Sequence, residues 1–155
     1  MVKKLPTINP RSALAFLHDV TAAGVAWLAA FWFRFNFDIQ SEFVPTMWTT
    51  VGWVVALDAL CFWRFGLYRG LWRYASIHDL RLMVIAVGVA AIAFPAMVVL
   101  IQPAFVVPRS VYVLHPMLLL FFMGGSRLLY RAWKERHIGK LGALYGKPVV
   151  ILCAG

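Results

Sequence analysis

The chain has 155 residues, of which 63% are hydrophobic and 14% are charged. Soluble domains are close to half apolar and about a quarter charged, so this composition excludes a soluble globular domain. The net charge of +9 is high enough for a nucleic-acid-binding protein. However, the basic residues lie at the ends of apolar segments and not as a stripe over one surface. We therefore expect a lipid bilayer, and no nucleic acid, as the partner.

Four apolar segments have the length of about 20 residues that a membrane-spanning helix needs. They cover roughly residues 12–33, 44–65, 80–101 and 110–130. Together they predict an all-α integral membrane domain of four transmembrane helices over residues 1–138.

The positions of the charges predict the orientation of these helices. All but two of the 15 Lys and Arg residues precede the first segment, separate the second from the third, or follow the fourth. The exceptions are Arg34 and Arg109, at the other two connections. An excess of Lys and Arg marks the cytoplasmic side of a membrane protein. The pattern therefore predicts a multi-pass protein with both termini in the cytoplasm.

Several ionisable residues fall inside the predicted spans, where such groups are costly and often functional. His18 and Asp19 lie in the first span and Asp58 in the second. At 1.5 Å of rise per residue, all three are expected near one depth, close to Arg127 of the fourth span. The group could form a pocket for a phosphate or lipid headgroup, or it could pair internally and hold the bundle together. His115 is expected to lie alone on an apolar face.

Arginines and aromatic residues alternate in the short connection between the second and third segments. Arg69 and Arg73 are one helical turn apart there, and Arg131 lies on a basic face of the fourth segment. Three interpretations stay open: these arginines bind anionic lipid headgroups, they dock a cytoplasmic domain, or they only set the topology. A second copy of the chain is a further candidate partner.

The last part of the chain, residues 139–155, is predicted to be a linker followed by a β-strand. A loop is expected from Gly139, and residues 149–152 form a short β-branched apolar run before Cys153 and Gly155. Such a run before a glycine is typical of the first strand of a Rossmann-type fold. Gly155 is the one candidate cofactor-binding residue. The sequence indicates no catalytic residue and no metal site.

Three stretches, taken together, resemble one protein family. They are FGLYRGLWRYASIHDL from Phe65, PRSVYVLHPMLLLFFMGGSRLLYR from Pro108, and the ending GKPVVILCAG. In order and spacing they are similar to the N-terminal membrane region of bacterial membrane-bound nucleotide-sugar 4,6-dehydratases, which act in polysaccharide, O-antigen and glycan synthesis. The resemblance covers nearly the whole chain.

The resemblance implies a membrane anchor in the bacterial inner membrane, truncated at the first strand of its own cytoplasmic domain. In the family, that domain binds NAD(P) and a UDP-sugar and forms a 4-keto-6-deoxy sugar. None of its catalytic residues lies in this chain, so the chain alone is expected to hold no cofactor and to be inactive. Gly155 matches the second glycine of the family's nucleotide-binding turn, whereas Cys153 replaces the first.

Two other functions remain open from the sequence. The chain also resembles the N-terminal membrane region of polyisoprenyl-phosphate sugar-1-phosphate transferases, which share four spans and an arginine-bearing second connection. Alternatively, it is a stand-alone membrane protein that interacts with others and performs no chemistry.

Overall fold

The structure, a computed structural model, describes residues 10–68, 77–101 and 106–144. Apolar residues suited to helices dominate these stretches, and the described part of the chain is helical without strands. Its four α-helices are α1 (Pro10–Arg34), α2 (Phe43–Arg64), α3 (Ile77–Ile101) and α4 (Arg109–Leu144).

Each of the four helices is long and apolar enough to cross a membrane. The qualifying segments are Ser12–Arg34, Phe43–Arg64, Leu80–Leu100 and Arg109–Lys134. The prediction of four spanning helices is therefore confirmed, and the segments begin and end close to the predicted positions.

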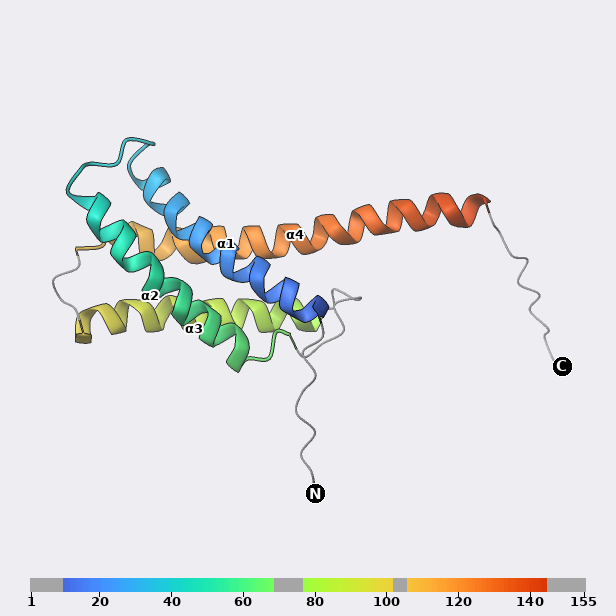
Figure 1. The fold of residues 1–155 in the computed structure, drawn as a ribbon, viewed down its shortest axis with the longest axis horizontal. Helices are drawn as coiled ribbons and strands as arrows, with labels where there is room; N and C mark the ends of the chain where they lie inside the picture. The colour runs from blue at the N-terminus through green and yellow to red at the C-terminus, as the bar shows by residue number, and fades with distance from the viewer. Residues whose placement is uncertain (1–9, 69–76, 102–105, 145–155) are drawn as a thin grey trace, which may run out of the picture.

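The helices form a closed ring in which each contacts its two neighbours along the chain, and α4 closes the ring against α1. Neither diagonal pair, α1 with α3 or α2 with α4, makes backbone contacts of this kind. In Figure 1, α1 and α2 run obliquely across α3 and α4, and α1 begins at the end of the bundle toward which α4 runs. The centre of the ring is consequently filled by side chains alone.

Small residues let α1 approach its neighbours closely, as they do in many membrane helices. Ala23, Ala26 and Ala30 recur about once per turn on one face of α1 and are fully buried. Farther along the ring, Trp27 of α1 meets Phe94 of α3 edge-to-face, with ring centroids 5.1 Å apart. This aromatic contact spans one diagonal of the bundle.

The outer face of the ring is apolar, as expected for helices surrounded by lipid. Large hydrophobic side chains on all four helices are exposed; Ile92 is 75% exposed and Leu100 is 82% exposed. An apolar surface of this extent would promote aggregation in water. In a bilayer it is the surface that contacts the acyl chains.

The structure differs from the sequence prediction directly after residue 138. A loop was expected from Gly139, but α4 continues as a helix to Leu144. A glycine inside a helix costs only about 1 kcal/mol relative to alanine, and extending an existing helix is far easier than starting one. The predicted strand, with Cys153 and Gly155, and the arginines at 69 and 73 lie outside the described residues.

The alanine face of α1 leads to a first prediction. Ala26→Leu should destabilise the bundle by about 1–3 kcal/mol, because extra methylene groups in a packed core force side chains and backbone to shift. Ala13→Leu is the matched control, since Ala13 is exposed on the same helix and leucine suits a lipid-facing position. Denaturation of the detergent-solubilised protein measures both. Equal stability of the two variants would contradict close packing at Ala26.

Candidate functional site

The first polar site, which we call the Asp19 cluster, joins His18, Asp19, Tyr68 and Arg127. Asp19 on α1 is fully buried. Its Oδ2 accepts hydrogen bonds from the Arg127 guanidinium of α4 at 2.8 Å and from the Tyr68 hydroxyl at 3.2 Å. Its Oδ1 lies 3.1 Å from Nδ1 of His18. One carboxyl group thus ties together α1, α4 and the segment that follows α2.

The Asp19 cluster combines opposite charges with hydrogen bonds. Arg127 supplies a compensating positive charge next to it, and charge-assisted hydrogen bonds are the strong ones in proteins. Burial, and then the nearby Asp19 carboxylate, raise the pKa of the Tyr68 hydroxyl far above its usual value. Tyr68 therefore keeps its proton at neutral pH and acts as a hydrogen-bond donor to Asp19.

The second polar site, the Asp58–His115 pair, crosses the centre of the ring. Nε2 of His115 on α4 lies 3.0 Å from Oδ2 of Asp58 on α2, and both side chains are buried. Since α2 and α4 are not neighbours in the ring, this hydrogen bond spans the diagonal opposite to the one filled by Trp27 and Phe94. The Trp27 ring packs edge-to-face on the His115 ring, with centroids 5.3 Å apart.

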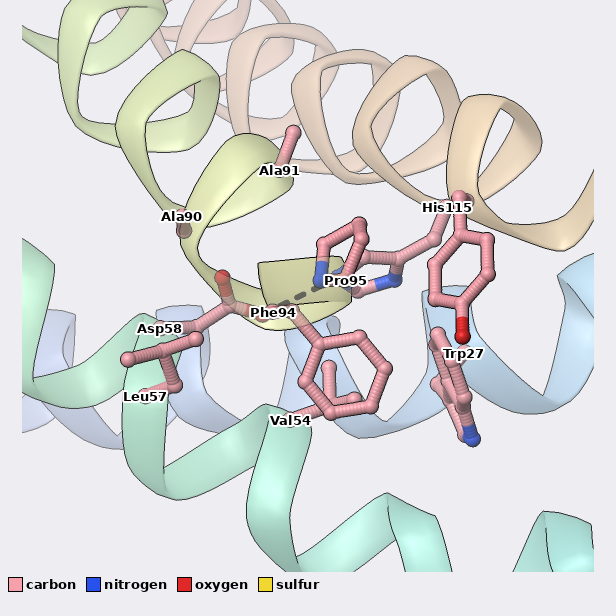
Figure 2. A pocket seen from close by; sticks show the side chains of 10 residues that line it. Trp27, Val54, Leu57, Asp58, Ala90, Ala91, Phe94, Pro95 and His115 are labelled. Carbon is pink, nitrogen blue, oxygen red and sulfur yellow. Dashed lines mark hydrogen bonds and ion pairs between the residues drawn. The ribbon is translucent and has the colours of Figure 1, made fainter. Parts of the chain in front are cut away.

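A small pocket lies beside the Asp58–His115 pair (Figure 2). All four helices line it: Trp27 comes from α1, Asp58 from α2, Phe94 and Pro95 from α3, and His115 from α4. Figure 2 shows the His115 side chain reaching from α4 toward Asp58, with the hydrogen bond between them drawn. The pocket has room for about one water molecule.

The structure brings together only part of the polar group predicted from the sequence. His18, Asp19 and Arg127 meet as expected. Asp58 instead pairs with His115, so the prediction that His115 lies alone on an apolar face is wrong. The expectation that Asp58 lies near Asp19 came from counting residues along each helix, which holds only for helices parallel to the membrane normal. In the structure, α2 runs obliquely to α4 (Figure 1).

Sequence reasoning also missed Tyr68 as a partner of Asp19. The chain turns after α2, and the Tyr68 side chain is half-buried against Asp19. One signal could have found both missing partners. Each of the two carboxyl groups inside the spans needs a hydrogen-bond donor, and His115 and Tyr68 are among the few polar groups available within or beside the helices.

The chemistry that these sites can perform is limited. Among the described residues, no group of three or more His, Cys, Asp and Glu could hold a metal ion. Arg131 is exposed on α4, and a headgroup-binding role for it stays a prediction. Gly155, the candidate cofactor contact, lies outside the described residues. Within these residues, the hydrogen bonds of Asp19 with Arg127 and of Asp58 with His115 join helices to one another.

Comparisons with protein families, with curated proteins and with solved structures found no match to this chain.

The Asp19 cluster leads to a second prediction. Asp19→Ala should destabilise the bundle by about 3 kcal/mol or more, because it removes the carboxylate that balances the partly buried charge of Arg127. Asp38→Ala should change stability by no more than about 0.5 kcal/mol, since Asp38 is exposed in the connection between α1 and α2.

A double-mutant cycle identifies the interaction itself. If Asp19 and Arg127 stabilise the bundle through each other, Asp19→Ala combined with Arg127→Ala should cost clearly less than the two separate losses added together. Denaturation of the solubilised protein gives all four stabilities. Simple additivity would show that the pair contributes no coupling.

Proposed function

We propose that this chain anchors a nucleotide-sugar 4,6-dehydratase of glycan synthesis to the bacterial inner membrane, with both termini in the cytoplasm. The identity of the enzyme rests on the resemblance in three stretches of sequence. The four spanning helices and the distribution of the basic residues support the anchoring role.

The observation that carries the anchoring role is the shape of α4. The membrane-crossing segment of α4 ends at Lys134, but the helix continues to Leu144 and projects beyond the other three helices (Figure 1). At about 1.5 Å per residue, this extension is roughly 15 Å long. A continuous helix transmits position better than a flexible linker does, so α4 would hold an attached domain at a set height above the membrane.

The benefit of such an anchor is local concentration. A domain held at the membrane meets membrane-bound partners at a higher effective concentration than a freely diffusing one. In the proposed function, the attached domain binds NAD(P) and a UDP-sugar such as UDP-N-acetylglucosamine. The partners would be the membrane-bound transferases that use its 4-keto-6-deoxy product.

The proposed orientation makes a third prediction, about which side of the membrane each connection faces. In a background of Cys61→Ala and Cys153→Ala, a membrane-impermeant maleimide should label Asp38→Cys in intact spheroplasts. It should label Arg136→Cys only after lysis, because the basic end of the bundle is expected in the cytoplasm. Both positions are exposed, so a permeant maleimide should label both. The reverse pattern would overturn the proposed topology.

The fourth prediction tests the enzyme itself. An antibody against residues 36–42 should detect, in membranes of the source organism, a species several times heavier than 17.5 kDa. After immunocapture, this species should convert a UDP-sugar with NAD(P) to a product that has lost one water molecule. The isolated chain of 155 residues is the control and should be inactive.

Three results would overturn the proposed dehydratase. One is a native species of 17.5 kDa without activity. Another is a heavier species that dehydrates no UDP-sugar from a panel. The third is transfer of a sugar phosphate to a polyisoprenyl phosphate, which would identify the transferase instead.

A further inference from the structure

The hydrogen-bonding capacity of the Asp58–His115 pair is incomplete. Nε2 of His115 is bonded to Asp58, whereas Nδ1 of the same ring is buried and has no hydrogen-bond partner among the described residues. The whole residue is only 7% exposed. A buried polar atom without a partner destabilises the folded state, so its presence at the centre of a membrane bundle calls for an explanation.

No protonation state of the pair removes this problem. If Asp58 is ionised and His115 neutral, Nε2 donates to the carboxylate and Nδ1 is a bare acceptor. If His115 is charged, both ring nitrogens are donors, and Nδ1–H is unsatisfied. If Asp58 is protonated and donates to Nε2, the ring proton sits on Nδ1, which is again an unsatisfied donor. Every state therefore leaves Nδ1 in need of a partner.

Pro95 leaves a second group at the same place without its usual helical donor. Proline has no backbone N–H, so inside a helix it leaves the carbonyl of the residue four positions earlier without its usual donor. For Pro95 of α3, that residue is Ala91. Both Ala91 and Pro95 line the pocket beside His115, so the residue whose carbonyl loses its helical donor is one of the wall residues of this pocket.

Pro116 likewise removes a backbone hydrogen bond from α4. It lies inside the helix and leaves the carbonyl of Tyr112 without a helical donor. Tyr112 also lines the pocket. Two prolines on two facing helices thus free the carbonyls of two residues around one pocket that also contains His115.

We propose that this pocket is a binding site for a single water molecule, held by Nδ1 of His115 and by the backbone carbonyls of Ala91 and Tyr112. The water would accept a hydrogen bond from Nδ1–H and donate its two protons to the two carbonyls. If Nδ1 is unprotonated, the water donates one proton to it and the other to a carbonyl.

The size and polarity of the pocket select water over larger ligands. The pocket has room for about one water molecule, and a buried water typically makes about three hydrogen bonds. Trp27, Val54 and Phe94 form apolar parts of the wall, which offer nothing to a second polar molecule. In membrane proteins, ordered waters are a known means of satisfying carbonyls freed by proline.

The test uses the full chain of 155 residues in lipid nanodiscs, with ¹⁵N-labelled histidine. Magnetisation transfer from water to the imidazole nitrogens is measured by NMR, and the His115 signal is assigned by its loss in His115→Gln. We expect transfer to the His115 ring in the wild type. The reference is Asp38→His, introduced into every variant. Asp38 is exposed in the connection between α1 and α2, outside the membrane-crossing segments, so this ring should exchange with water.

The proline variants test how the water is held. Pro95→Ala and Pro116→Ala each restore an N–H that occupies one carbonyl, so the double variant should lose the transfer to His115. Pro45→Ala is the matched control and should retain it. Pro45 lies in the first turn of α2, where a backbone N–H has no helical carbonyl to bond. An unchanged Nε2 shift shows that the bond to Asp58 survives in a variant.

Three outcomes would overturn the proposal. The first is the absence of transfer to His115 while the Asp38→His reference shows it. The second is undiminished transfer in the double proline variant with an unchanged Nε2 shift. The third is a His115 signal that shifts when sodium is replaced by choline, which would indicate a bound cation in place of water.

Discussion

The hydrogen bond between Asp58 and His115 determines how the four helices fit around one another. The backbones of α2 and α4 do not touch across the ring, so only side chains can set the distance between them. An apolar pair could pack there in several arrangements, whereas a buried carboxyl group and an imidazole need one another at hydrogen-bond distance. The pair therefore favours one register of α2 against α4. Trp27 and Phe94 fill the second diagonal around it.

Much of this fold could be predicted from the sequence, because a helix that crosses a lipid bilayer needs about 20 consecutive, mostly apolar residues. Four apolar segments of the right length led to four spanning helices near the expected positions. The end of α4 was predicted less well, since Gly139 suggested a loop. A glycine does not by itself end a helix. Extending a helix that has already formed is far easier than starting a new one, so α4 continues through Gly139.

The polar contacts were only partly predictable, for a geometric reason. His18 and Asp19 are adjacent, and Arg127 lies near the expected depth, so counting residues along the helices was sufficient for that cluster. Asp58 and His115 meet because the helices cross obliquely (Figure 1), and helix tilt depends on packing against neighbours and not on the length of the apolar segment. Depth counted along a helix is therefore a poor guide to contacts across a bundle.

The two polar sites differ in a way that separates a structural role from a binding role. Asp19 accepts from Arg127 and Tyr68 and lies beside His18, so both of its oxygens have partners and its charge is balanced. The Asp58–His115 pair has one mutual bond and a ring nitrogen left over, next to two residues whose carbonyls are freed by proline. The value of the Asp19 carboxylate is the connection that it makes between α1, α4 and the segment after α2. The Asp58–His115 pair lies beside a pocket of molecular size, which is why the centre of the ring is the place where we expect a bound molecule.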